Sequence, residues 1–375
     1  MFEKTKALCD SFLDMGIPGF DLMVCKDGEC VLRYMNGYSD RENQIRMSGK
    51  ELYNIYSCSK PITCVAAMQL WEKGLFSLDD KLSDYMPEYA QMTVKTDKGI
   101  VPAQNPIRIH HLFEMTSGLN YDVQSPSLRR LRENTNGTCP TREVARAIAN
   151  EPLSFDPGAQ YLYSLAHDVL AALVEIWSGQ KFEVYVKEHI FTPLSMTHSD
   201  FLLPLEEYQK VVPLYCTSNI KLHPNGNVPM YRLGSEHASG GAGCVSTVED
   251  YMKFIEELRT GERLIKRDTL RLMTTQRLTK DQLATFTLPT HGFGLGMRVP
   301  RGDGLRSDFG WGGAAGAYMA LDIPNGISLY YVQHVTASPN QTLRPRIYET
   351  VVEELTGVAL KQPDEAEPID QNLTY

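Results

Sequence analysis

Hydrophobic residues recur at helical spacing in many separate stretches of the chain. In the stretch after Lys60, Val65, Met68 and Leu70 follow this spacing, and Gly74 provides an end. Pro61 falls in the first turn, where a proline interrupts no hydrogen bond. We predict helices over residues 3–15, 58–73, 106–115, 141–150, 164–178, 182–190, 247–260 and 343–355.

Short apolar runs between turn residues predict strands near both ends of the chain. The turn signals Lys26-Asp27-Gly28-Glu29 and Ile323-Pro324-Asn325-Gly326 each join two of them. The predicted strands are 20–25, 30–35, 292–299, 318–322 and 328–334.

This order of elements predicts a mixed α/β (α+β) fold in which both ends of the chain build one sheet. A region of helices is inserted between the two ends. We expect a discontinuous sheet domain from residues 1–75 and 235–360, a mostly helical domain over 76–234, and an acidic tail over 361–375.

Composition and charge exclude several classes of function. The net charge of −9, with no basic stripe among aromatic residues, argues against a nucleic-acid partner. No apolar run has the length of a membrane span, and the first residues lack the apolar core of a signal peptide. The eight cysteines are dispersed; their even number permits disulfides, but a large chain without an export signal more often keeps its thiols reduced. We therefore expect a cytoplasmic protein.

The spacing Ser-x-x-Lys is the first candidate for chemistry. Only the copy Ser57/Lys60 stands at the start of a long apolar helix. Backbone N–H groups and the helix dipole there favour negative charge that develops on Ser57. Lys60 lies one turn further on the same face. A serine that only caps the helix has the same local sequence. The three copies are Ser57/Lys60, Ser178/Lys181 and Ser218/Lys221.

Two later stretches add candidate groups. Tyr161 and Tyr163 precede the helix over 164–178, and a phenol beside a cation can act as a general base, although most tyrosines at such places only pack. The stretch Phe309 to Tyr318 is rich in glycine ahead of a strand. Exposed N–H groups there can complete an oxyanion hole, and a tight bend in the sheet would look the same.

In this order, the three stretches resemble the serine hydrolases that include penicillin-binding proteins and class C β-lactamases. The resemblance extends from Ile17 to about Gly357. Within that family the chain is most similar to family VIII carboxylesterases and related acyltransferases, because it carries Tyr163-Ser164-Leu165 and Trp311-Gly312-Gly313 at the second and third motifs. The resemblance implies a β-lactamase/DD-peptidase-like fold, an antiparallel sheet flanked by helices with an inserted all-helical region.

The resemblance also implies roles for individual residues. Ser57 is the expected nucleophile, with Lys60 and Tyr163 sharing the proton transfers. We expect the Lys60 ammonium to lower the pKa of the Tyr163 phenol. The N–H groups of Ser57 and Ala314 form the expected oxyanion hole. Contacts to substrate are expected from Trp311, Gly312, Gly313, Tyr56, Leu165 and Phe309.

Two departures from the family pattern limit the range of substrates that we expect. Leu165 stands where the β-lactamases carry asparagine, and Trp311 where they carry a lysine or histidine that attracts a substrate carboxylate. Losing one charge-assisted hydrogen bond costs on the order of 2 kcal/mol. The expected substrate is therefore a small, uncharged ester or acyl compound, cleaved through an acyl-serine. Alternatives are acyl transfer to an alcohol, weak β-lactamase or D-amino-acid amidase activity, and a penicillin-binding-like sensor without turnover.

Other signatures are absent from the sequence. There is no G-x-S-x-G, Walker or dinucleotide motif, and the stretch Gly240 to Gly243 lacks the Lys-Ser/Thr that a phosphate loop needs. His110, His111 and His237 do not form an H-E-x-x-H motif, and we interpret them as structural or surface residues rather than metal ligands. We expect no cofactor.

Overall fold

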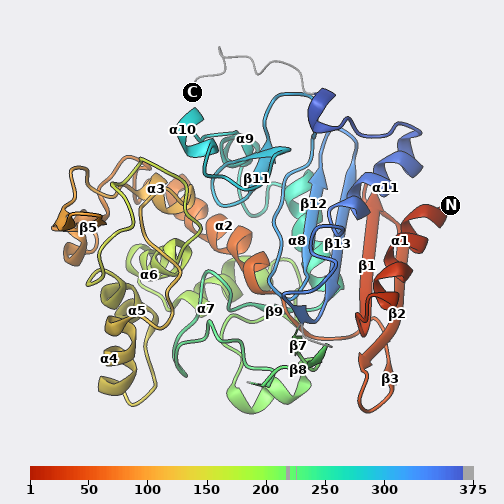
Figure 1. The fold of residues 1–375 in the computed structure, drawn as a ribbon, viewed down its shortest axis with the longest axis horizontal. Helices are drawn as coiled ribbons and strands as arrows, with labels where there is room; N and C mark the ends of the chain where they lie inside the picture. The colour runs from red at the N-terminus through yellow and green to blue at the C-terminus, as the bar shows by residue number, and fades with distance from the viewer. Residues whose placement is uncertain (217–219, 225, 366–375) are drawn as a thin grey trace.

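A five-stranded antiparallel sheet forms one side of the molecule (Figure 1). The computed structural model describes residues 1–216, 220–224 and 226–365. The strand order is β12-β13-β1-β2-β3, so the first and last parts of the chain meet in one sheet, as predicted. The strands are β1 (Gly19–Lys26), β2 (Glu29–Asp40), β3 (Ile45–Arg46), β12 (Tyr318–Asp322) and β13 (Ile327–Gln333).

Helices cover both faces of this sheet because its buried strands present apolar side chains to both sides. Along β13, Leu329 and Tyr331 belong to the apolar cluster shared with α1 (Glu3–Asp14) and α11 (Arg346–Thr356). Tyr330 and Val332 point the other way, into the cluster shared with α8 (Val248–Thr260). Helix α8 packs on both β13 and β1.

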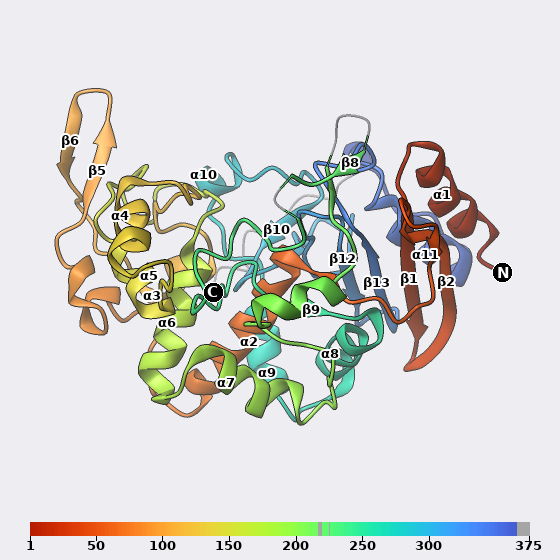
Figure 2. The ribbon, with the colours of Figure 1, turned by 90° about the horizontal axis from the view of Figure 1, so that it is seen from below.

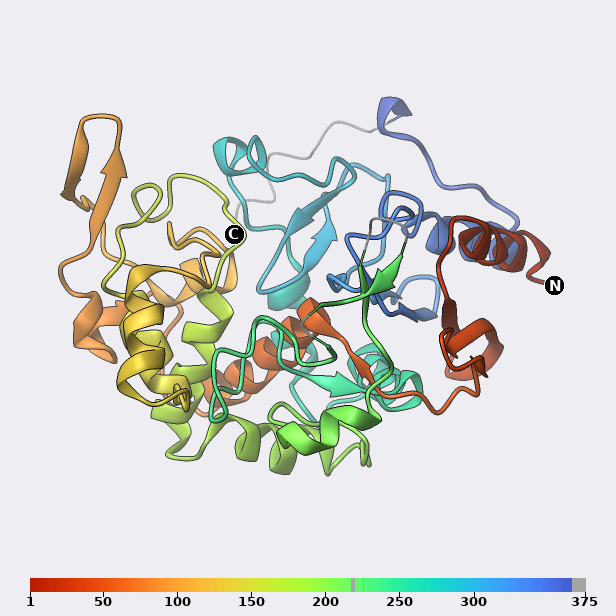
Figure 3. The same ribbon diagram turned by 60° about the horizontal axis from the view of Figure 1, so that its bottom comes forward.

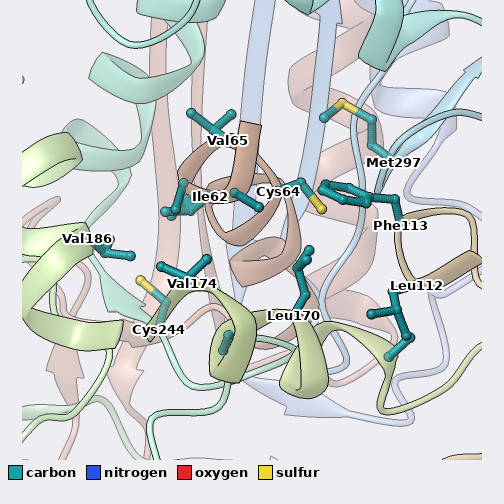
Figure 4. Packing of buried hydrophobic residues seen from close by; sticks show 14 of the residues in the cluster. Ile62, Cys64, Val65, Leu112, Phe113, Leu170, Val174, Val186, Cys244 and Met297 are labelled. Atoms are coloured by element: carbon teal, nitrogen blue, oxygen red, sulfur yellow. The ribbon is translucent and has the colours of Figure 1, made fainter. Parts of the chain in front are cut away.

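Helix α2 (Ser59–Glu72) runs between the sheet and the helical half of the molecule (Figures 1 and 3). A single turn of 3-10 helix, Tyr56–Cys58, leads into it. Nearly every side chain of α2 is buried, as expected for a helix that is apolar around its whole circumference. It packs on α6 (Ala166–Ser178), and Figure 4 shows the apolar side chains gathered around it.

The remaining elements are short. A hairpin of β5 and β6 projects from the helical side (Figure 2). The remaining helices are α3 (Ile109–Phe113), α4 (Pro126–Asn134), α5 (Thr141–Ile148), α7 (Phe182–Val186) with a π-helical turn Lys187–Phe191, α9 (Arg267–Thr274) and α10 (Lys280–Leu283). The remaining strands are β4 (Tyr53–Asn54), β5 (Thr93–Thr96), β6 (Gly99–Pro102), β7 (Tyr215–Cys216), β8 (Lys221–Leu222), β9 (Val245–Ser246), β10 (His291–Phe293), β11 (Arg298–Pro300) and β14 (Val335–Thr336).

The prediction of one strand over 292–299 is wrong. The chain folds back on itself there, and β10 pairs antiparallel with β11. Gly296 makes the turn in the left-handed region with φ 96°, and a Cβ on it would lie 2.2 Å from the sulfur of Cys64. Helices α4 and α9 were not predicted from the sequence, and the helix expected over 106–115 is only α3.

Two further observations concern the whole described chain. Within residues 1–216, 220–224 and 226–365, no helix combines the length and the apolar character needed to cross a bilayer. Most of the expected acidic tail, from residue 366 onward, lies outside the described residues.

Candidate active site

Ser57 lies where strand β4 ends and the central helix begins. Strand β4 pairs with β9, and the N–H of Ile55 donates to the carbonyl of Cys244 at 3.1 Å, which fixes the entry of the chain. Tyr56 then adopts a left-handed backbone with φ 48°, a conformation that costs a non-glycine residue about 1 kcal/mol or more. Ser57 is 9% exposed, so only a small part of the residue is open to solvent.

Lys60 is fully buried beneath Ser57. Its Nζ lies 3.4 Å from the Ser57 Oγ and donates to the carbonyl oxygen of Gly241 at 2.7 Å. The same Nζ lies 3.5 Å from the Tyr121 hydroxyl and 4.5 Å from the centroid of the Tyr163 ring. The three-residue spacing along the helix therefore brings the two groups of the Ser-x-x-Lys motif together.

Burial also changes the proton affinity of this lysine. Loss of solvation lowers the pKa of Lys60 to about 7, although the negative charge of Asp168 acts in the opposite direction. An exposed lysine has a pKa near 10.4 and is almost entirely charged at neutral pH. Lys60 can therefore accept a proton at neutral pH.

Tyr163 lies beside Ser57 and Lys60, on the loop before α6. Its hydroxyl accepts a hydrogen bond from the Trp311 Nε1–H at 3.2 Å, and its ring stacks between Trp311 and Tyr121 with centroid distances of 5.6 and 5.4 Å. Burial raises the pKa of Tyr163, and the hydrogen bonds from Ser57 and Trp311 only partly offset this. The expectation of a lowered pKa for this phenol is wrong because burial outweighs its neighbours. A neutral Tyr163 is a proton donor.

Tyr161, the alternative tyrosine, is separate from these groups. It is buried, and its ring packs edge-to-face on Phe286 and Phe293 at 4.9 and 5.3 Å. Its backbone N–H donates to Thr285 Oγ1 at 3.0 Å. These contacts are those of a residue that packs the core.

The glycine-rich stretch lies directly against the start of the helix. A Cβ on Gly313 would lie 2.3 Å from the carbonyl oxygen of Ile55, so only glycine fits there. The Cys58 Sγ–H points to the carbonyl oxygen of Trp311 at 3.7 Å. Ala314 follows Gly313 and is exposed. Close packing of the two backbones brings the segment carrying the Ala314 N–H beside the segment carrying that of Ser57.

A row of aromatic rings lies beside Lys60. Tyr231, which was not predicted from the sequence, packs edge-to-face on both Tyr121 and Tyr56, with centroid distances of 5.4 and 5.9 Å. Successive ring contacts connect Tyr56, Tyr231, Tyr121, Tyr163, Trp311 and Phe293.

The other residues expected to touch substrate lie deeper. Tyr56, Leu165 and Phe309 are only 2, 4 and 4% exposed. Phe309 belongs to the apolar core and pairs its backbone with Leu321. Gly312 is half-buried and bridges to Tyr318.

A buried polar cluster behind Lys60 was also not predicted. Asp168 Oδ1 accepts a hydrogen bond from Ser239 Oγ at 2.6 Å, and His237 Nε2 lies 3.6 Å from the same oxygen. His237 is thus a buried structural residue, and burial lowers the pKa of its imidazole. The signal in the sequence was Asp168 itself, an acidic residue inside the apolar stretch of α6.

The described Ser-x-x-Lys copy Ser178/Lys181 shows no such environment. Ser178 ends α6, where its hydroxyl donates to the Val174 carbonyl at 2.6 Å and accepts from the Gln180 N–H at 3.1 Å. These are the contacts of a serine that assists chain reversal. Ser218 lies outside the described residues.

Two other features could bear on ligands. A groove of about 1010 Å³ runs between the segment 45–52 and the segment 187–213, and none of Ser57, Lys60, Tyr163 and Trp311 lines it. Within the part of the chain that the structure describes, no three histidine, cysteine, aspartate or glutamate residues gather as a metal site would need.

Comparisons with known proteins agree on the fold. The Beta-lactamase family model matches residues 6–351. Esterase EstB of Burkholderia gladioli is 28% identical over 338 residues, which cover 82% of this chain and 83% of EstB. A putative D-alanyl-D-alanine carboxypeptidase of Escherichia coli is 26% identical over 376 residues, covering 90% and 83% of the two chains. The solved structure of EstCE1, a hydrolase with promiscuous acyltransferase activity, matches with a TM-score of 0.79 and 25% identity, covering 93% and 97%.

Proposed function

Because the chain belongs to the β-lactamase family, whose members include serine hydrolases, we propose that it cleaves carboxylic esters through an acyl-serine intermediate. One observation carries the proposal: the Ser57 Oγ lies 3.4 Å from the Nζ of a buried lysine whose pKa is lowered to about 7. A serine hydroxyl needs such a base nearby to become a nucleophile.

In the first step, the Ser57 oxygen forms a bond to the ester carbonyl carbon and its proton passes to the Lys60 Nζ. Negative charge then develops on the carbonyl oxygen. The N–H groups of Ser57 and Ala314 stabilise it, and one such donor is worth roughly 3 kcal/mol. Gly313 permits this arrangement because it lets the strand edge pack against Ile55.

In the second step, the carbon–oxygen bond to the alcohol breaks and the leaving oxygen needs a proton. Tyr163 supplies it, since burial raises the pKa of its phenol and keeps the phenol protonated. Lys60, now charged below the Tyr163 ring, returns a proton to the phenol. Water activated by the same groups then cleaves the acyl-serine, and its proton restores Ser57.

The substrate is an uncharged ester. Aromatic rings pack around Tyr163, and the third motif offers the neutral Trp311 in place of a cation. A carboxylate there would lose solvation without gaining a charged partner. The relative EstB, which bears the name of an esterase, is consistent with this choice.

Acyl transfer to an alcohol is the second candidate. Ser57 is 9% exposed and lies among aromatic rings, so bulk water has restricted access to the acyl-serine. An apolar alcohol that binds to those rings would compete with water. EstCE1 combines hydrolysis with promiscuous acyl transfer.

The proposal is tested with p-nitrophenyl butyrate and a fluorophosphonate label. We expect the wild-type protein to cleave the ester and take up the label, and Ser57→Ala to do neither. Ser178→Ala, the matched serine of a second Ser-x-x-Lys copy, should behave as wild type. Nitrocefin turnover should be weak, and an added alcohol should yield a new ester if transfer competes with hydrolysis. A wild-type protein that neither cleaves esters nor takes up the label would refute the proposal.

A further inference from the structure

Asp168 carries an unpaired oxygen in a buried position next to the site. The residue is 2% exposed, and its Oδ1 accepts from Ser239 Oγ at 2.6 Å. Its Oδ2 is buried and has no hydrogen-bond partner among the described residues. A buried carboxylate oxygen without a partner is costly, so its retention calls for a compensating interaction.

The oxygen points toward the gap left by a glycine. A Cβ on Gly241 would lie 2.6 Å from the Asp168 Oδ2 and 3.4 Å from the Lys60 Nζ. The carbonyl oxygen of Gly241 already accepts from that Nζ at 2.7 Å. The Asp168 Oδ2 and the Lys60 Nζ therefore both lie close to the position that a side chain on Gly241 would occupy.

The other titratable groups around Lys60 carry no charge at neutral pH. Burial raises the pKa of Cys58 to about 12, raises the pKa values of Cys64 and Tyr121, and lowers the pKa of His167 to about 3. Tyr163 and His237 are neutral for the same reason. Among the described residues that face Lys60, Asp168 is thus the source of negative charge.

We propose that Asp168 is the positioning residue for Lys60, holding a counter-charge across Gly241 so that the buried lysine can take up the proton of Ser57. This inference rests on the proposed function. Without the carboxylate, the same burial would leave the ammonium with no compensating charge, and Lys60 would be a weaker base. Asp168 itself touches neither substrate nor the reacting atoms.

The test is the pH dependence of kcat/KM for p-nitrophenyl butyrate. In the wild type, kcat/KM should rise as pH passes through about 7, because only neutral Lys60 accepts a proton. In Asp168→Asn, we expect this inflection to move to lower pH by about one unit and the plateau to fall about tenfold, with little change in KM. Gly241→Ala should shift the inflection in the same direction, since its methyl group displaces the carboxylate.

Asp250→Asn is the matched control. Asp250 is also buried, but it binds the His198 N–H and Lys253 rather than Lys60, so its removal should leave the inflection in place. A lower plateau with an unmoved inflection in Asp168→Asn would show a merely structural role and overturn the inference. If that variant does not fold, an unmoved inflection in Gly241→Ala overturns it equally.

Failure of the proposed function can be told apart from failure of this inference. In a Ser57→Ala background the charge of Lys60 can be followed directly by NMR titration of its 13Cε resonance, with no turnover involved. Adding Asp168→Asn should lower the Lys60 midpoint by about one unit. An unchanged midpoint would contradict the inference whatever the protein catalyses.

Discussion

Replacing Trp311 with phenylalanine separates two roles of this side chain. The change keeps an aromatic ring that can stack on Tyr163 and meet Phe293, but removes the Nε1–H that donates to the Tyr163 hydroxyl at 3.2 Å. One neutral hydrogen bond is worth about 1 kcal/mol net, which corresponds to about fivefold in rate. The lost bond also raises the pKa of Tyr163, so the phenol becomes a poorer proton donor.

The effect should depend on the leaving group. An ethoxide ion is a strong base and must be protonated as it leaves, whereas p-nitrophenolate leaves without a proton. For Trp311→Phe we therefore expect kcat/KM to fall about fivefold on ethyl butyrate and to change little on p-nitrophenyl butyrate. Both esters share one acyl group, so differences in the acyl pocket cancel.

Trp177→Phe is the control. Trp177 stacks on Phe76 with a centroid distance of 3.9 Å, away from Ser57, and its replacement should leave the ratio of the two rates unchanged. If Trp311→Phe slowed the cleavage of both esters equally, the indole would act only by shaping the site. If neither rate changed, the hydrogen bond to Tyr163 would play no part in proton transfer.

Two further substitutions test the choice of Tyr163 as the proton donor and the contribution of the buried ion pair between Asp308 and Arg298 to stability. Tyr163→Phe should fold normally and lose about 100-fold in kcat, while Tyr161→Phe, measured in parallel, should stay near wild type; the reverse result would identify Tyr161 as the acid. Asp308→Asn should cost about 3 kcal/mol in urea unfolding, because it leaves the buried Arg298 without its partner. Burial alone would raise the pKa of Asp308, but Arg298 and His291 hold it well below its usual range. Wild-type stability should therefore fall as pH drops below about 4, and a variant with the same acid sensitivity would contradict this assignment.

The sequence predicted the site best where the residues that form it lie close together along the chain. Ser57 lies in the 3-10 turn that leads into α2 and Lys60 follows three residues later in α2, so local spacing alone brings them together. The strands β1 and β13 were predictable as well, since their sequences are short, apolar runs bounded by turns. These features depend only on neighbouring residues.

What the sequence did not predict depends on contacts between distant segments. Tyr121 and Asp168 come from separate parts of the chain, and only the fold brings them near Lys60, with Tyr231 packed on Tyr121. The pKa of Tyr163 was misjudged because a nearby ammonium was visible in the sequence and the depth of burial was not. The hairpin at Gly296 was missed because the close approach of this glycine to Cys64 joins distant segments and is not visible in the sequence.

The sheet order has a consequence for how the protein is made. Strand β1 pairs on one edge with its sequence neighbour β2, but on the other edge with β13, from the far end of the chain. Trp311 and Gly313 precede β12, whose neighbouring strand in the sheet is β13. During synthesis, the serine and lysine therefore emerge long before the strands that complete their surroundings. Such distant pairing slows folding, so the central sheet and the surroundings of Ser57 should form together, late, once the last strands are available.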